Sequence, residues 1–295
     1  MKRNYIITVG DLQRLISERS AQNISLKNGN VLKEGVHYNE ADDSFSFDFQ
    51  NDNETDIISL TKVGYKISAF NHCYYYAYEF SENIDSVKRS AFIHSLKFPD
   101  GRISKKDKNT FIMNAVDKLD TEISLPSYKL IVYPESISEL NREMLRYLNR
   151  FASPDIVNME LVKTLPSRIE FDYNRFKMEI LDAKLPNGKG RYTELQKQTV
   201  ITNIQKMMDE IHNLDYFSIA RNVKKAKYRQ YIRNYYTFKS DGDRQLFEKI
   251  MNSNVLIIDD ILTSGTTLSH LLNCLRTVNN KNNIVIFSLI GKNIE

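Results

Sequence analysis

The chain has 295 residues, of which 41% are hydrophobic and 26% are charged, and its formal net charge is +4. This length accommodates one large or two modest domains, and the ordinary composition excludes a disordered or fibrous protein. The mild positive charge suits an anionic ligand without requiring a nucleic acid. The two cysteines, Cys73 and Cys274, lie far apart, which excludes a disulfide framework and a cysteine-rich zinc site.

The sequence shows no secretory signal at its amino end and no run approaching the roughly 20 apolar residues that span a bilayer. We therefore expect a cytoplasmic protein without a membrane partner. The sequence does not specify the oligomeric state, and a dimer is compatible with it.

Residues 1–124 are predicted to form an N-terminal α+β unit of unknown role. Helical spacing occurs from Val9 to Ile16 and again from Phe111 to Leu119, and residues 44–50 alternate as in a half-buried strand. Residues 67–98 are rich in aromatic side chains, which core packing explains.

Residues 125–295 are predicted to form the second unit, and it begins with a strand, a loop and a helix. Tyr128 to Tyr133 has strand character, residues 134–139 form a polar loop that includes Ser136, and Leu140 to Phe151 has helical spacing. Asp155 to Leu165 is predicted to be the next core strand.

About ninety residues then separate this strand from the next, more than a crossover needs, so residues 166–250 are predicted to be an insertion. The insertion has a turn-rich tip at 186–190, a helix from Thr193 to His212 and a strand from Phe217 to Ile219. Its residues 221–233 carry six basic side chains and no acid. They fit a nucleic-acid surface, a cationic wall facing an anionic ligand, or a solvated basic face.

The stretch from Val255 to Leu268 carries the clearest chemistry. Four branched apolar residues predict a strand buried on both faces, and Asp259 and Asp260 follow at its carboxyl end. Helical spacing resumes at Leu268 after a hydroxyl-rich loop containing Thr263, Ser264, Gly265, Thr266 and Thr267. Hydroxyls, a glycine and a helix start favour a bound phosphate, whereas the carboxylates suit sugar hydroxyls or magnesium. The alternative is that these residues merely cap the helix.

This stretch resembles the phosphoribosylpyrophosphate (PRPP) signature of the type I phosphoribosyltransferases. The resemblance implies that Asp259 and Asp260 contact the ribose hydroxyls and that residues 263–267 hold the 5′-phosphate. It places Ser136 in a pyrophosphate-binding loop. If residues 221–233 form the cationic wall, Lys227 and Arg229 belong to it and lie near the pyrophosphate. Relatives that use 6-oxopurines usually carry an aspartate where this chain has Thr263, which disfavours such a base.

The segment order from Phe92 onward is also faintly similar to the ComF-like branch of this family, without that branch's N-terminal cysteine-rich metal element. We therefore expect an α/β fold with a doubly wound, mainly parallel sheet, an inserted hood and an N-terminal α+β unit.

The function that the resemblance implies is transfer of a 5-phosphoribosyl group from PRPP, with Mg²⁺, to a nitrogen nucleophile. Two alternatives stay open: a non-catalytic PRPP- or nucleotide-sensing protein, including a phage or anti-phage effector, and a nucleic-acid-associated protein using residues 221–233.

Overall fold

The structure is a computed structural model, and it describes residues 34–48, 58–60, 64–67, 72–80, 85–182, 192–262 and 265–291. The helix predicted from Val9 to Ile16, the tip at 186–190, and Thr263 and Ser264 of the hydroxyl-rich loop lie outside the described residues. None of the described helices is long and apolar enough to cross a membrane.

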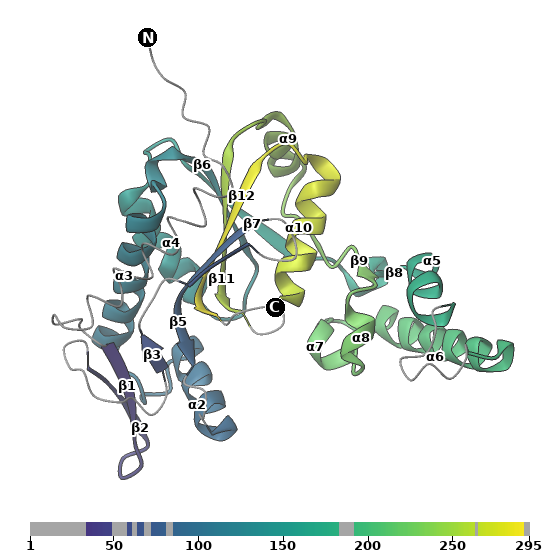
Figure 1. Ribbon diagram of the computed structural model, residues 1–295, viewed down its shortest axis with the longest axis horizontal. Coiled ribbons are helices and arrows are strands. Elements are labelled where there is room, and N and C mark those ends of the chain that lie inside the picture. Colours follow the sequence, from purple (N-terminus) through teal and green to yellow (C-terminus); the bar gives the residue numbers. More distant parts are fainter. Residues whose placement is uncertain are drawn as a thin grey trace, which may run out of the picture.

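A mainly parallel sheet forms the centre of the molecule (Figure 1). Its parallel strands have the order β7-β6-β11-β12-β5 and the bounds β5 Cys73–Phe80, β6 Tyr128–Pro134, β7 Val157–Lys163, β11 Asn254–Ile261 and β12 Asn283–Gly291. Antiparallel strands extend both edges. At one edge β10 (Tyr236–Phe238) pairs with β7. At the other edge β3 (Ile58–Leu60) and β4 (Gly64–Ile67) pair with β5, and β1 (Glu34–Asn39) and β2 (Ser44–Asp48) follow beyond β3.

Helices cover both faces of the sheet, because successive residues of a strand point to opposite sides. Leu256 and Ile258 of β11 pack in one apolar cluster with α3 (Lys105–Glu122) and α4 (Leu140–Phe151), whereas Val255 and Ile257 pack in a second cluster with α10 (Thr266–Val278). Helices α2 (Ser86–Lys97) and α9 (Asp241–Lys249) add to the first and second cluster, respectively. The expectation of a strand buried on both faces is confirmed for β11.

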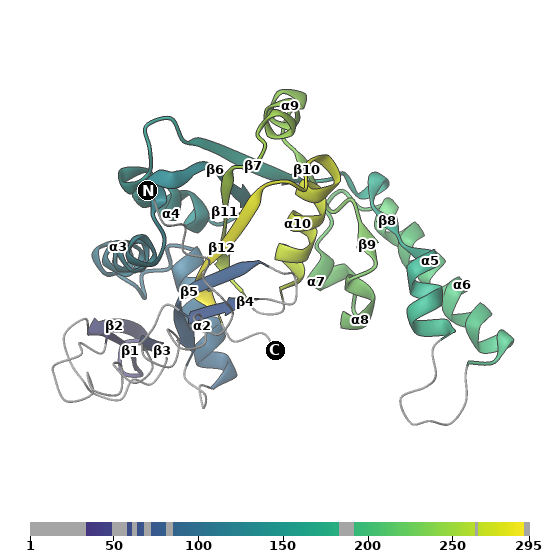
Figure 2. The same cartoon turned by 45° about the horizontal axis from the view of Figure 1, so that its top comes forward.

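Residues 166–182 and 192–235 form a hood that extends from one side of the sheet (Figure 2). It contains two short strands, β8 (Glu170–Phe171) and β9 (Ile232–Arg233), and the helices α5 (Tyr173–Phe176), α6 (Glu194–His212), α7 (Ile219–Asn222) and α8 (Ala226–Arg229). The remaining described elements are single-turn 3-10 helices at Leu125–Ser127 and Pro166–Arg168 and a π-helical turn at Lys177–Leu181.

The strand predicted from Phe217 to Ile219 is wrong. Ile219 opens α7, and the carbonyl of Ser218 accepts backbone hydrogen bonds from Arg221 and Asn222 at 3.1 and 2.8 Å. The Asn222 side chain accepts from the Ser218 N–H as well, so local hydrogen bonding favours a turn of helix over an extended segment.

The sheet runs across the division that the sequence predicts between residues 124 and 125. Strand β5, from the first predicted unit, pairs in parallel with β12, from the second. Two elements inside the predicted insertion 166–250 also belong to the core. Strand β10 pairs with β7, and helix α9 packs on the sheet. The two-unit division stays a prediction, and a single sheet joins its two halves.

Candidate functional site

Asp259 and Asp260 end the central strand β11. Both residues are buried, each with 5% of its surface exposed. The backbone N–H of Asp260 donates to Asp259 Oδ1 at 3.0 Å, and the N–H of Ile261 donates to Asp260 Oδ1 at 2.6 Å. Each carboxylate is thus oriented by the backbone of the residue that follows it.

The loop after β6 lies beside these acids. Ser138 Oγ donates to Asp260 Oδ2 at 3.4 Å, and its own N–H donates to Ser136 Oγ at 3.2 Å. Asn141, in the first turn of α4, donates to the carbonyl of Pro134 at 3.4 Å. Its Oδ1 is buried and has no hydrogen-bond partner in the described structure. Strand β6 and the start of α4 therefore bring a set of small polar groups to the carboxyl end of β11.

The position of these two loops follows from the order of the strands. From β6 the chain continues through α4 to β7 on one side, and from β11 it continues through α10 to β12 on the other. Adjacent parallel strands whose connections leave in opposite directions open a crevice at their carboxyl ends, where α/β proteins bind ligands. The acids and the Ser136 loop lie at this switch point.

Helix α10 begins at the same crevice. Gly265 has φ 71° and precedes the first helical residue, Thr266, in the left-handed conformation that glycine adopts without strain. The Gly265 carbonyl accepts the N–H of Ser269 at 2.9 Å. The N–H groups of the first turn and the hydroxyl of Thr267 can donate hydrogen bonds to an anion, so this end of the helix suits anion binding.

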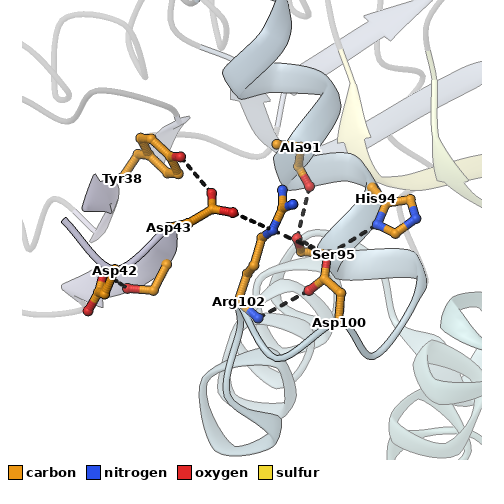
Figure 3. A network of polar contacts seen from close by, with 9 residues as sticks. Tyr38, Asp42, Asp43, Ala91, His94, Ser95, Asp100 and Arg102 are labelled. Carbon is orange, nitrogen blue, oxygen red and sulfur yellow. Dashed lines mark hydrogen bonds and ion pairs between the residues drawn. The ribbon is translucent and has the colours of Figure 1, made fainter. Parts of the chain in front are cut away.

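Lys97, the last residue of α2, adds a cation to the acid pair. Its Nζ lies 2.6 Å from Asp260 Oδ2, and its side chain is 26% exposed. The turn after Lys97 is fixed by Asp100, which accepts from Ser95 Oγ at 2.8 Å and from the backbone N–H of Arg102 at 3.1 Å (Figure 3). Arg102 also reaches Asp43, so this network holds the end of α2 in place.

The burial of the two carboxyl groups changes their protonation. Desolvation, together with the neighbouring Asp260 charge, raises the pKa of Asp259 to about 8, although the Lys97 ammonium opposes this rise. At neutral pH the pair therefore holds a proton that two exposed aspartates would not hold.

These groups surround a pocket of about 300 Å³, which we call the switch-point pocket. Its lining includes Asp259, Asp260, Thr267 and Ser136 from the predicted site, together with Lys97, Ser138, Asn141, Lys163 and the hood residues Ser218, Ile219 and Ala220. The structure thus brings together the acids, one hydroxyl of the phosphate loop and the serine of the predicted pyrophosphate loop.

Lys227 and Arg229 do not line this pocket. Lys227 is exposed on α8, and Arg229 donates to the carbonyls of Val223 and Ala220, at 3.0 Å each. Arg229 therefore joins α7 to α8 within the hood, and the cations that line the pocket with the acids are Lys97 and Lys163.

The sequence interpretation missed Lys97, Lys163 and Ser138 as site residues. Ser138 belongs to the predicted loop, but no pattern in the sequence indicates that Ser138 is the serine that points at Asp260. Lys97 lies 163 positions from Asp260, and its role depends on the pairing of β5 with β12, which no local pattern indicates.

Comparisons with known proteins give little further information. No protein-family model matches the chain, and no curated protein matches it. Among solved structures, a hypoxanthine phosphoribosyltransferase from Staphylococcus aureus is similar with a TM-score of 0.31 and 14% identity, over 63% of this chain and 70% of that chain. A similarity of this size carries no argument about the activity of this chain.

Proposed function

We propose that the protein binds PRPP in the switch-point pocket and transfers its 5-phosphoribosyl group to a nitrogen nucleophile. The observation that carries the proposal is the convergence of Asp259, Asp260, Thr267 and Ser136 on one pocket of about 300 Å³ at the carboxyl ends of β6 and β11. This volume lies at the lower end of the range for small-molecule sites.

In this proposal, each wall of the pocket meets one part of PRPP. Asp259 and Asp260 accept hydrogen bonds from the ribose 2′- and 3′-hydroxyls, and the loop 263–267 with the start of α10 holds the 5′-phosphate. Ser136 and Ser138 face the pyrophosphate. The charge that develops on the departing pyrophosphate is stabilised by Lys97 and Lys163, which line the pocket.

The transfer forms a bond between the nucleophilic nitrogen and the anomeric carbon. The bond from that carbon to pyrophosphate breaks, pyrophosphate keeps the electron pair, and the nitrogen releases its proton to the solvent. A transition state of this kind resembles a ribosyl cation, so placement and electrostatic stabilisation matter more than a general base.

Magnesium fits this arrangement as a companion of the ligand. No cluster of three or more His, Cys, Asp or Glu in the described ranges forms a complete metal site. Mg²⁺ usually takes one or two carboxylates together with substrate phosphates and water. Asp259 and Asp260 would supply such carboxylates once the charge of the ion displaces the proton that the pair holds. The ion would neutralise phosphate charge when bound with PRPP.

Thermal unfolding with and without PRPP and MgCl₂ tests the binding step. A ligand at 100 times its Kd stabilises the native state by about 2.7 kcal/mol, so the unfolding midpoint should rise with PRPP and rise further with magnesium. Replacing both acids, Asp259→Asn with Asp260→Asn, should abolish the shift in a folded protein. Asp117→Asn, on the exposed face of α3, is the matched control. A double variant that is unstable but still shifts with PRPP would support helix capping alone.

A second measurement separates transfer from sensing. Pyrophosphate release should be detected when PRPP is mixed with ammonia, amines or nucleobases in turn. A PRPP-induced thermal shift with no pyrophosphate release for any nitrogen nucleophile would leave a binding protein and exclude the transferase.

A further inference from the structure

A second and larger cleft lies next to the switch-point pocket. Its volume is about 860 Å³, and it is bounded by β8, β9 and α5 of the hood, by Thr164 just after β7, and by β10, α9 and α10 beside the sheet. Tyr235 and Tyr236 line both cavities, whereas Asp259 and Asp260 line only the smaller one. We call the larger cavity the arginine cleft.

The lining of the arginine cleft carries more positive than negative side chains. Five arginines line it against two acids: Arg168, Arg175, Arg233, Arg244 and Arg276, with Glu170 and Asp172. The chain as a whole has a net charge of only +4, so the cleft concentrates positive charge.

The arginines differ in how far they are already paired. Arg233 forms an ion pair with Asp172, and Arg175 pairs with Glu179 at 2.8 Å. Arg168 and Arg244 are exposed, and within the described residues their guanidinium groups have no hydrogen-bond or ion-pair partner. These two belong to opposite walls: Arg168 to the hood, and Arg244 to α9 beside the sheet.

Neutral polar groups accompany the arginines. His270 is 96% buried, with 4% exposed, and its Nε2 has no hydrogen-bond partner in the described part of the chain. Burial lowers the pKa of His270 to about 4, so the ring is uncharged at neutral pH. Thr164 Oγ1, also beside the cleft, is likewise buried and unpartnered among the described residues. A ligand group that bonds to either atom would offset its desolvation.

We propose that the arginine cleft binds a nucleoside polyphosphate. Arginine presents a planar fork of donors that matches phosphate oxygens, and the two unpaired guanidiniums on opposite walls suit a chain of phosphates lying between them. The neutral His270, Thr164 and the nearby Asn273 suit the hydroxyls and ring nitrogens of a nucleoside. The volume is in the range of sites that enclose ligands of this size.

A nucleic acid is less well matched than a small ligand. Tight binding to a phosphate backbone needs many phosphate contacts along a track. The tyrosines in the cleft, Tyr235 and Tyr236, are buried, so they offer no exposed ring on which bases could stack. A bounded cleft with two unpaired arginines fits one polyphosphate better than a strand.

Equilibrium binding of a fluorescent ATP analogue to the full chain tests the proposal. The protein has no tryptophan, so ligand fluorescence can be followed with little protein background. We expect saturable binding that weakens at least tenfold in Arg168→Glu with Arg244→Glu. The matched control is Arg146→Glu with Arg221→Glu, which makes the same charge change at exposed arginines outside the cleft and should bind as wild type.

Competitors identify the ligand class. ATP should displace the analogue, while adenosine and inorganic tripolyphosphate should each be at least tenfold weaker. If tripolyphosphate displaces the analogue as effectively as ATP, the cleft does not recognise the nucleoside. If a single-stranded oligonucleotide binds more tightly than ATP, the nucleic-acid alternative is favoured. Equal loss in the control pair, or no saturable binding by wild type at millimolar ATP, would overturn the proposal.

The arginine cleft and the switch-point pocket are tested independently. Asp259→Asn with Asp260→Asn should leave binding of the ATP analogue unchanged, because neither acid lines the arginine cleft. Loss of nucleotide binding in that double variant would place the nucleotide in the switch-point pocket and overturn the second site. Failure of PRPP to bind would leave this result unaffected.

Discussion

Asp259 is enclosed by the sheet and lies beside a second carboxyl group, and both features favour its protonated form. Its pKa is raised to about 8, so folding takes up a proton as long as the unfolded aspartate is ionised. The stability from this group is fully present below the unfolded pKa, about 4, and is lost as the pH rises through about 8. The acid pair therefore ties stability to pH in the neutral range.

Replacing Asp259 by asparagine should remove this dependence. The asparagine side chain would keep an Oδ1 that accepts the N–H of Asp260 and would carry no proton to lose. From pH 5 to pH 8, urea unfolding should show wild type losing stability relative to Asp259→Asn, by at most about 1.4 kcal/mol per pH unit for one proton. Parallel pH curves for the two proteins would show that Asp259 is ionised in the native state.

Thr164 gives a prediction of the opposite kind, a stabilising substitution. Its buried hydroxyl has no partner in the described structure, and an unsatisfied buried polar group costs about 1–3 kcal/mol. Valine has nearly the same shape, so Thr164→Val should raise the free energy of unfolding by about 1 kcal/mol. Urea denaturation without nucleotide measures it. Thr121→Val, at an exposed position of α3, serves as control. An equal stabilisation there would show that the intrinsic preference of the backbone for valine, and not the buried hydroxyl of Thr164, causes the effect.

At the scale of elements, the sequence predicted those whose apolar pattern is local. The helix expected from Leu140 to Phe151 has the observed bounds of α4, because Leu140, Met144 and Leu148 share one buried face. β11 was predicted from its unbroken apolar run. The error at Phe217 to Ile219 arose because two buried residues at alternate positions fit a strand and a helical turn equally well.

The turn between α2 and α3 is an element whose role the sequence did not reveal. Asp100 joins this turn to Ser95, His94 and Arg102 (Figure 3). Burial alone would raise the pKa of Asp100, but the hydrogen bonds from Ser95, Arg102 and His94 and the Arg102 charge lower it overall. The turn follows Lys97, so it sets where that ammonium lies relative to Asp260.

Asp100→Asn should therefore destabilise the protein by about 1.5–3 kcal/mol, the range for a hydrogen bond to a charged group. The Asp100 carboxylate contributes above the usual pKa of an aspartate, near 4, and the contribution is lost as the pH falls through its lowered value. The difference from wild type should thus be full at pH 7 and shrink below about pH 4 in urea titrations. Asp117→Asn is the control, and a loss of the same size there would contradict a specific role for the turn.

At the scale of the molecule, the sequence predicted the class of fold and the strand-end position of the acids. It could not predict that β5 lies beside β12, since more than 200 residues separate Cys73 from its partner Val285. A pairing of this range depends on which strand edge is left open after the other strands have assembled, and no local pattern records that. The same limit hid Lys97, whose helix follows β5.

The continuity of the sheet predicts how the chain behaves when it is cut at the predicted division. Removing residues 1–124 would take away β5 and α3, leaving β12 as an open edge and uncovering apolar residues such as Val285 and Phe287. Fragment 125–295 should therefore aggregate or lack a cooperative urea transition. Mixing it with fragment 1–124 during refolding should restore the transition and, with it, the contact of Lys97 with Asp260. Cooperative unfolding of 125–295 alone, at a midpoint equal to that of the full chain, would instead establish the two-unit division and show that β5 is dispensable for the sheet.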